Sequence, residues 1–260
     1  MSYYYGDQSW EQLQEYVKKD AVLILPVGQT EEHGSHLPVS TDATIAEGFA
    51  RDIAEAVEGE VPVLVMPAIW AGYSPIAMGK WPGTMMIRPQ VFIDYVHDVC
   101  ASLVRAGFKK MIMLDCHGQH NPMLNIVTKL IADEFDGVYL AVTSPVKMSA
   151  EAFNKVRKSG RGGSCHGGEW ETALMLSLTD LVDMDKVTDV DTIRYNSEFV
   201  AGDATLGSQK VVWSTWGTQA SITGLYGDPT PATKETGDVI RKAAIENYKK
   251  FLIEYYNFGR

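Results

Sequence analysis

The sequence predicts an α/β fold in which a central, mainly parallel sheet has helices on both faces. Short apolar runs alternate along the chain with longer amphipathic stretches, which is the pattern of strands joined by crossover helices. These runs are too uniformly apolar for strands with one face in water, so helices should cover both sides of the sheet. The chain has 260 residues and no linker or internal repeat, and we expect residues 1–260 to form a single domain.

Four apolar runs are the candidate central strands, at 21–27, 61–66, 111–114 and 138–143. A helix is expected to begin at Thr41, because apolar residues then recur every four positions as far as Val57. Further helices are predicted after Pro89, over 169–178 and over 234–256. Strands and helices therefore alternate along most of the chain.

The charge balance and the cysteine content narrow the classes of function. Lys and Arg number 23 against 33 Asp and Glu, a net charge of −10, so a broad nucleic-acid or anionic-membrane surface is not expected. The 3 cysteines lie far apart without a C-x-x-C pair, which favours a reducing compartment and no disulfides. No leader-like segment opens the sequence, and no apolar run is as long as a membrane-spanning helix. We therefore expect a cytoplasmic protein whose partner is a small-molecule substrate.

Two loops that directly follow predicted strands carry side chains that can bind a metal ion. The first loop contains Glu31, His33, His36 and Asp42, and the second contains His117. In an open parallel sheet the strand ends open into the ligand crevice, so these side chains can converge without entering the packed core. Carboxylate oxygens and imidazole nitrogens suit zinc, manganese or iron. The first loop alone is more simply explained as a polar surface loop, but two such loops at equivalent positions favour a metal site.

A third cluster of polar side chains lies beside a glycine-rich stretch. Residues 160–168 hold five glycines in nine positions, too many for a regular element, and are expected to form a loop beside a ligand. This stretch includes His166, and the helix predicted after it begins with Glu169 and Glu171. The helix dipole favours acidic side chains in a first turn whatever the function, so Glu169 at least needs no chemical role.

Five segments occur in an order and spacing that resemble a known family. They are LPVGQTEEHGSHLPVSTD at 25–42, KWPGT at 80–84, LDCHGQHN at 114–121, HGGEWETALML at 166–176 and GLYGDPTPATKETG at 224–237. The spacing G-x-x-E-x-H-G-x-H-x(5)-D in the first segment is specific, and the five segments run over most of the chain. On these motifs the chain resembles the creatininase family of metal-dependent amidohydrolases. The resemblance implies a three-layer α/β/α subunit that holds two divalent metal ions.

The resemblance also implies roles for individual residues. Asp42 is expected to bridge the two ions, Glu31 and His117 to complete the protein ligands of one ion, and His33 to bind the other. Two divalent ions would activate a water molecule and polarise a carbonyl, so hydrolysis is the expected reaction. His166 resembles the catalytic histidine of the family and is expected to carry a proton to the leaving group.

The second metal site departs from the family pattern at one position. The creatinine-cleaving member has a Glu two residues after the histidine that His117 matches, and this chain has Gln119 there. A neutral amide brings no charge, so the site is either weaker or completed by another group. Glu171 is the candidate, both as metal ligand and as catalytic residue, because a third carboxylate beside Glu31 and Asp42 brings a two-metal site closer to neutrality. Alternatively, Glu171 orients a ligand histidine.

The expected substrate is small, polar and cyclic, with an amide-type carbonyl, but it is not creatinine. Aromatic rings that close over creatinine in the family's creatinine-cleaving member are replaced here by Gly118, by glycines around Gly162, and by 144–146. The expected substrate contacts are Gln119, His120, Lys80 and Trp81. Two alternatives stay open: hydrolytic C–C ring opening of a cyclic polyol diketone such as 3-dehydro-scyllo-inosose, and a non-catalytic metal-containing binding protein.

Two surface features complete the expectations. Arg157, Lys158 and Arg161 are the only basic cluster near the glycine loop that could cradle a phosphate-bearing substrate, or they form a solvated surface. By resemblance the chain is expected to form a homo-oligomer, a hexamer, and the aromatic residues of the last predicted helix exceed what its own core needs. Those aromatic residues are Tyr248, Phe251, Tyr255, Tyr256 and Phe258.

Overall fold

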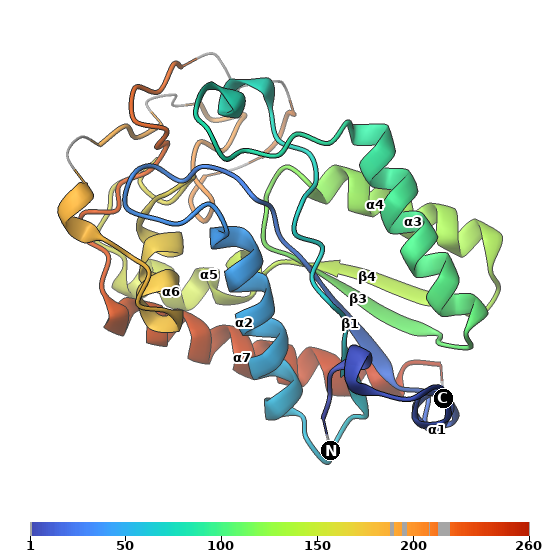
Figure 1. Ribbon diagram of the computed structural model, residues 1–260. Helices are drawn as coiled ribbons and strands as arrows, with labels where there is room; N and C mark the ends of the chain where they lie inside the picture. The colour runs from blue at the N-terminus through green and yellow to red at the C-terminus, as the bar shows by residue number, and fades with distance from the viewer. Residues whose placement is uncertain (1, 188–189, 194–196, 208, 213–218, 260) are drawn as a thin grey trace.

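The computed structural model describes residues 2–187, 190–193, 197–207, 209–212 and 219–259 and shows three α/β/α layers (Figure 1). The described sheet has four parallel strands in the order β2-β1-β3-β4. Their bounds are β1 Val22–Val27, β2 Val63–Val65, β3 Lys110–Asp115 and β4 Tyr139–Thr143. The predicted fold class is thus confirmed. The prediction that all four runs are central is wrong for β2 and β4, which lie at the edges.

Seven α-helices form the outer layers in the described part of the chain. Helices α3 (Pro89–Arg105) and α4 (Asn121–Glu134) cover one face of the sheet. The other face is covered by α2 (Thr41–Ala56), α5 (Pro145–Val156), α6 (Glu169–Leu178) and α7 (Lys234–Asn257), while α1 (Trp10–Lys18) lies beside the C-terminus (Figure 1). Three short 3-10 helices are η1 (Tyr5–Asp7), η2 (Ile76–Lys80) and η3 (Met184–Lys186). No α-helix among the described residues combines the length and the apolar character that a membrane crossing needs.

The alternation of side chains along β1 divides the core into two parts. Leu23 and Leu25 point to the α3 and α4 side, where they pack in one cluster with Phe92. Val22 and Ile24 point to the opposite side and pack with residues of α2 and α7. Burial of each such side chain contributes roughly 1.5–3 kcal/mol of transfer free energy. The sheet is therefore packed on both faces, and this packing fixes where the loops at the strand ends begin.

The carboxyl ends of β1 and β3 finish level with each other, and this places the polar loops together. Val27 pairs with Asp115 at the last position of the register. Directly after β1, Gly28 lies so close to the first turn of α2 that a Cβ atom would overlap the backbone of Ala43. Only glycine permits this approach. It brings Asp42, in the first turn of α2, to the end of the sheet.

Helix α7 keeps its aromatic residues within the subunit. Its buried face includes Ile240, Ala244, Tyr248 and Leu252, about one residue per turn, whereas Val239 is 39% exposed. The Tyr255 hydroxyl lies 3.1 Å from the carbonyl oxygen of Met111 and 2.6 Å from that of Tyr139, so the tail packs against the start of the sheet. The expected homo-oligomer stays a prediction, and of the aromatic residues named for it only Phe258, 58% exposed, remains largely on the surface.

Candidate metal centre

Four of the predicted ligands meet at the carboxyl ends of β1 and β3. Glu31, His33, Asp42 and His117 are all buried. Asp42 lies between the two imidazoles: its Oδ1 is 3.2 Å from His33 Nε2, and its Oδ2 is 2.9 Å from His117 Nδ1. Glu31 Oε1 is 3.8 Å from His117 Nδ1. The two strand ends, joined by the approach at Gly28, therefore place carboxylates and imidazoles around one point.

Helix α6 adds Glu171 from the other side of the cluster. Its Oε2 is 3.9 Å from His33 Nε2 and accepts a hydrogen bond of 2.7 Å from the backbone N–H of Gly167. Like Asp42, Glu171 lies in the first turn of a helix, where the positive end of the helix dipole favours an ionised carboxylate. The site thus receives one acidic residue from each of two helix N-termini.

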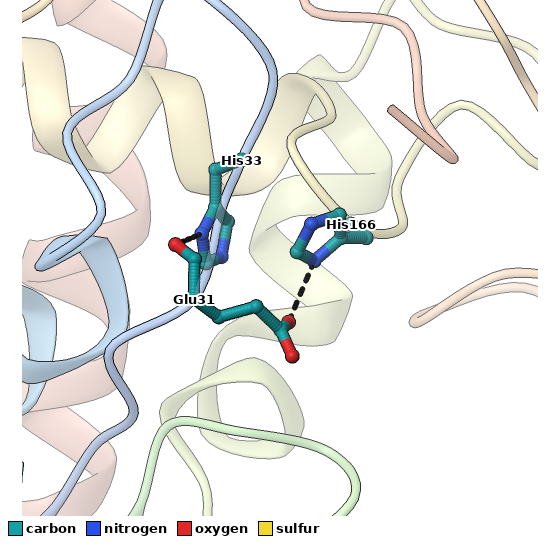
Figure 2. A group of neighbouring side chains, drawn as sticks. All are labelled: Glu31, His33 and His166. Atoms are coloured by element: carbon teal, nitrogen blue, oxygen red, sulfur yellow. Dashed lines mark hydrogen bonds and ion pairs between the residues drawn. The ribbon is translucent and has the colours of Figure 1, made fainter. Parts of the chain in front are cut away.

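Ligand atoms in this cluster form three groups in which all atoms lie within 4.8 Å of one another. One group is Glu31, Asp42 and His117, and another is His33, Asp42 and Glu171. These two groups share only Asp42, which faces each of them with a different oxygen. The third group is Glu31, His33 and His166 (Figure 2). The structure brings the predicted ligands together, and their roles in binding metal stay predictions.

His166 extends from the glycine-rich loop toward Glu31, as Figure 2 shows. Its Nδ1 is 3.2 Å from Glu31 Oε1, and its Nε2 donates a hydrogen bond of 2.5 Å to the backbone carbonyl of Glu32. The carboxylate of Glu32 also lies here, with Oε1 3.5 Å from His166 Nε2. Sequence reasoning missed Glu32, which is 5% exposed. Its position between two predicted ligands was the available signal, but an irregular loop gives no rule for the direction of a side chain.

The pKa values in the cluster reflect close pairing of opposite charges. Burial alone would lower the pKa of His33, but attraction to Asp42 and a hydrogen bond with it raise that pKa to about 10. Burial also opposes protonation of His117, whose pKa is raised to about 9 by Glu31 and Asp42. Burial would raise the pKa of Asp42, but the two histidines hold it well below its usual range. Without metal, protons on the two imidazoles therefore offset two of the carboxylate charges.

The residues present fit a divalent cation. Glu31 Oε2 is buried and has no hydrogen-bond partner among the described residues, so one oxygen of this carboxylate is available to a cation. A buried carboxylate oxygen without a donor is costly unless an ion or a water satisfies it. Oxygen and nitrogen ligands of this kind match zinc, manganese or iron. Three buried or half-buried carboxylates offset three of the four positive charges of two such ions, and two imidazoles add neutral nitrogen ligands.

Other predicted site residues lie around this cluster with other contacts. Gln119 is half-buried in the turn before α4. His120 is 0% exposed and stacks on Phe92 with a centroid distance of 4.2 Å, so in this structure it offers no surface to a substrate. The Nζ of Lys80 lies 4.9 Å from the ring centroid of Trp81 and donates a hydrogen bond of 3.1 Å to the backbone carbonyl of Ser221. The substrate contacts therefore stay predictions. Burial of His120 makes it the least favoured of them.

Two residues near the glycine-rich loop have partners that account for them. The carboxylate of Glu169 accepts hydrogen bonds from the backbone N–H groups of Lys158 and Ser159, consistent with a structural role. The guanidinium of Arg157 pairs with Asp203 at 2.9 Å, so one of the three cations considered for a phosphate cradle is already paired.

Further candidate residues fall outside the cluster or outside the described residues. His36 is buried and bonds through Nε2 to the hydroxyl of Thr172 at 2.9 Å. The pKa of His36 is lowered to about 4 by burial and by the neighbouring histidines, so its ring is neutral. Two tryptophans that could line a pocket, Trp213 and Trp216, lie outside the described residues.

Comparisons with known proteins agree with this geometry. The family model described as creatininase, creatinine amidohydrolase, matches residues 6–252. The 3-dehydro-scyllo-inosose hydrolase of Thermotoga maritima is 34% identical over 116 residues, which are 45% of this chain and only 36% of that protein. The creatinine amidohydrolase of Pseudomonas putida is 29% identical over 203 residues, 72% of this chain and 76% of that protein. The mycofactocin precursor peptide peptidase of Mycobacterium tuberculosis is 27% identical over 233 residues, 86% of this chain and 82% of that protein.

Solved structures show the same fold over the whole chain. A structure described as "Creatininase Mn" has a TM-score of 0.80 at 22% identity and covers 99% of this chain and 100% of its own. A mutant creatininase of "Zn-Zn type" has a TM-score of 0.81 at 23% identity and covers 99% of both chains. The fold, the motif order and the family match over 6–252 agree, and the chain belongs to the creatininase family.

Proposed function

We propose that this protein is a metal-dependent hydrolase that holds two divalent ions, zinc, manganese or iron, and attacks a carbonyl of a small polar substrate. The observation that carries the proposal is the position of Asp42. Its two oxygens face different imidazoles, and it is the residue common to the group Glu31, Asp42 and His117 and the group His33, Asp42 and Glu171. This is the arrangement that a bridging carboxylate requires.

The chain's own residues divide into two sets of ligands around Asp42. Glu31 and His117 would hold one ion with it, and His33 and Glu171 would hold the other. Glu171 reaches the second group, which supports it as the carboxylate that takes the role of the glutamate this chain lacks at position 119. Bound divalent ions would supply a water molecule activated near neutral pH and would polarise the substrate carbonyl.

His166 has the contacts expected of a residue that moves a proton. The hydrogen bond from Nε2 to the Glu32 carbonyl keeps a proton on that nitrogen, so Nδ1 faces Glu31 and the ligand cluster at 3.2 Å. A ring held in this way can exchange a proton at Nδ1 with a group bound beside Glu31. Burial of the ring at 8% exposure keeps bulk water from competing for that proton.

The surroundings favour a substrate other than creatinine. Gly118 is exposed, and a Cβ there would meet no atom within 4 Å, so the described residues leave open space where an aromatic wall would stand. A planar ring would lose its stacking contacts in such a site. We therefore propose a cyclic amide with polar substituents as the substrate class.

A second candidate is hydrolytic opening of a C–C bond in a cyclic polyol diketone. It is favoured by the relative from Thermotoga maritima, which has 34% identity to this chain over 116 residues and is named for 3-dehydro-scyllo-inosose. Addition of water to one carbonyl and cleavage of the adjacent bond would give a carboxylate, with the second proton delivered to carbon. The same residues would serve both reactions, so the substrate decides between them.

The test is a substrate screen with zinc- and manganese-loaded protein against lactams, formamides and cyclic polyol ketones. We expect turnover in one of these classes and loss of that turnover in His166→Gln with both ions retained. A His97→Gln variant is the matched control, because His97 lies on α3 and pairs with Glu134, away from the ligand cluster. Tight binding of two ions with no turnover of any class would instead favour a metal-containing binding protein.

We also propose a homo-oligomer, a hexamer by family resemblance. Trp70, Ile76 and Met86 are 60%, 89% and 49% exposed, and large apolar side chains on a surface often mark a subunit contact. Light scattering at micromolar protein concentration should give a mass several times 28.7 kDa. A monomer under those conditions would contradict this part of the proposal.

A further inference from the structure

We infer that the buried pair Arg157 and Asp203 is a positioning device for His166, because it fixes the loop that carries this histidine. The inference rests on the proposed function, in which His166 moves a proton. Neither residue touches the ligand cluster. Both act through the backbone of residues 159–168, and the pair is treated below as one unit, the Arg157–Asp203 pair.

Asp203 organises the first half of the loop by accepting hydrogen bonds from its backbone. Its side chain is 0% exposed. Oδ2 accepts from the N–H of Gly162 at 2.8 Å and from the N–H of Ser164 at 3.3 Å. Oδ1 accepts from the N–H groups of Thr205 and Leu206, both at 3.0 Å. One carboxylate therefore joins the glycine-rich loop to the segment around 203–206.

Arg157 completes the same unit from the end of α5. Its Nη1 and Nη2 donate to Asp203 Oδ1 and Oδ2 at 3.0 and 2.9 Å, a two-point pairing with little freedom. Nη2 also donates to the carbonyl of Gly160 at 2.7 Å, and Nε donates to the carbonyl of Ser159 at 3.0 Å. The guanidinium thus binds carbonyl oxygens of the loop, and Asp203 binds backbone N–H groups of the same loop.

Further backbone hydrogen bonds connect the part of the loop held by the Arg157–Asp203 pair to His166. Glu169 N–H donates to the carbonyl of Gly163 at 3.2 Å, and the N–H of Asp228 donates to the same carbonyl at 2.9 Å. Two residues beyond Ser164, the carbonyl of His166 accepts from the N–H of Tyr226 at 3.0 Å. Displacement of Gly162 and Ser164 would therefore move the residues that support the histidine.

Glycine-rich sequence makes external support of this kind necessary. Five glycines in 160–168 give the loop high conformational entropy in the absence of contacts. Within the loop, Gly162 adopts a positive φ of 85° and Gly167 one of 67°. A buried ion pair adds little to global stability once its desolvation is counted, but it can select one conformation. We therefore assign the Arg157–Asp203 pair to the geometry of His166 rather than to the stability of the chain.

The first test is a ring nitrogen spectrum of zinc-loaded, ¹⁵N-histidine-labelled protein. The chain has 6 histidines, and His166→Gln assigns the signals of His166. We expect Asp203→Asn and Arg157→Lys to shift or broaden the His166 signals and to leave those of His33 and His117 in place. Lysine keeps the charge but cannot form the two-point pairing. This measurement needs no substrate, so it decides the inference even if the proposed reaction is wrong.

A matched control is available in a second Arg–Asp pair. Arg241 Nε and Nη2 donate to Asp52 Oδ2 at 3.1 and 2.7 Å, and this pair joins α7 to α2. Asp52→Asn should leave all histidine signals unchanged. Unchanged His166 signals in Asp203→Asn and Arg157→Lys would overturn the inference. So would equal movement of all histidine signals, or failure of both variants to fold, because each outcome means that the pair serves the whole chain.

The second test is kinetic and uses whichever substrate the screen finds. We expect Asp203→Asn to lower kcat roughly 10–100-fold with two ions retained and with a much smaller change in KM, because a misplaced catalytic group costs about that much. His166→Gln is assayed for its residual turnover at high protein concentration, and the same substitution in that background should lower this residual rate no further. Equal loss in both backgrounds would show that Asp203 does not act through His166.

Discussion

The two ends of strand β3 hold buried charges in opposite ways. At its start, Lys110 is 2% exposed and donates to Asp20 at 3.0 Å and to the backbone carbonyl of Tyr256 at 2.6 Å, so the cation has its counter-charge and its acceptors. At its end, Asp115 is followed by His117, which meets Glu31 and Asp42. Among the described residues, the ion-pair partners of Glu31 and Asp42 are imidazoles.

The difference separates a structural charge from a site that can bind an ion. The Lys110 cluster is complete in itself. At the other end, Glu31 Oε2 lacks a partner among the described residues, and burial raises the pKa of Asp115 to about 7 although the His117 N–H donates to it. An excess of buried acceptors is costly unless cations satisfy it. The comparison predicts that substitutions at the two ends of β3 will have different effects.

The largest effect is expected from Asp42→Ala. Loss of the carboxylate shared by both ligand groups should remove both ions and abolish turnover, because each ion keeps only two of its protein ligands. The metal content measured by mass spectrometry should fall from close to two ions per chain to close to none. Retention of both ions by this variant would contradict the bridging role.

A smaller effect should distinguish Glu171 from Gln119. Glu171→Gln should lower the affinity for one of the two ions by about 10–100-fold and leave the affinity for the other unchanged, whereas Gln119→Ala should change both affinities little. Titration of metal-free protein with zinc, followed by calorimetry, measures the two affinities separately. The reverse ordering of the two variants would assign the second site to Gln119.

Metal binding should release protons from His33 and His117. Their pKa values of about 10 and 9 keep both rings protonated at pH 7, and an imidazole that binds a metal ion must be neutral. Because these values lie above the unfolded value of 6.5, the charge pairing stabilises metal-free protein below pH 6.5 and is lost as pH rises through 9 to 10. For Asp42 the lowered pKa gives stabilisation that is present above 3.8 and lost in acid.

The measurable consequence is that zinc affinity rises with pH between 6 and 8, by roughly tenfold per pH unit for each proton released. Calorimetry in buffers of different ionisation enthalpy counts those protons directly. Binding without proton release at pH 7 would show that the imidazoles are neutral before the ion arrives.

The smallest effect is expected at the other end of β3. Lys110→Met should cost about 1–2 kcal/mol of unfolding free energy, because Asp20 is partly exposed and can be solvated. Denaturant unfolding measures this cost, and the variant should still bind both ions. Loss of metal in Lys110→Met would mean that the two ends of the strand are coupled.

Most of the sheet and four of the seven described α-helices could be predicted from the sequence pattern. Helices α1, α4 and α5 could not, and each has a physical reason. Helix α1 is short, with 9 residues, and buries none of them fully; the capping box of Ser9 and Gln12 marks its start. Helix α4 begins at Asn121 inside the polar loop, directly after the candidate ligands and substrate contacts. Helix α5 follows an edge strand and begins with Pro145. Strand order depends on long-range pairing, which local pattern does not contain.

For the site, residue types and loop positions are enough to predict that Glu31, His33, Asp42 and His117 are neighbours. The approach of Glu171 is predictable only from charge, because it depends on how α6 packs against α2. Glu32 is marked in the local sequence only by its position between two predicted ligands, and the Arg157–Asp203 pair has no local signature. Their importance comes from contacts between segments that are far apart along the chain.

The close approach at Gly28 has a consequence for how this family diversifies. Because the backbone of Ala43 fills the space of a side chain at this position, the turn after β1 and the first turn of α2 cannot vary independently. New specificities are then expected in segments without a glycine held in such a close approach, such as 73–78 and 84–87. Laboratory evolution toward a new substrate should begin with libraries in those segments and leave 25–42 unchanged.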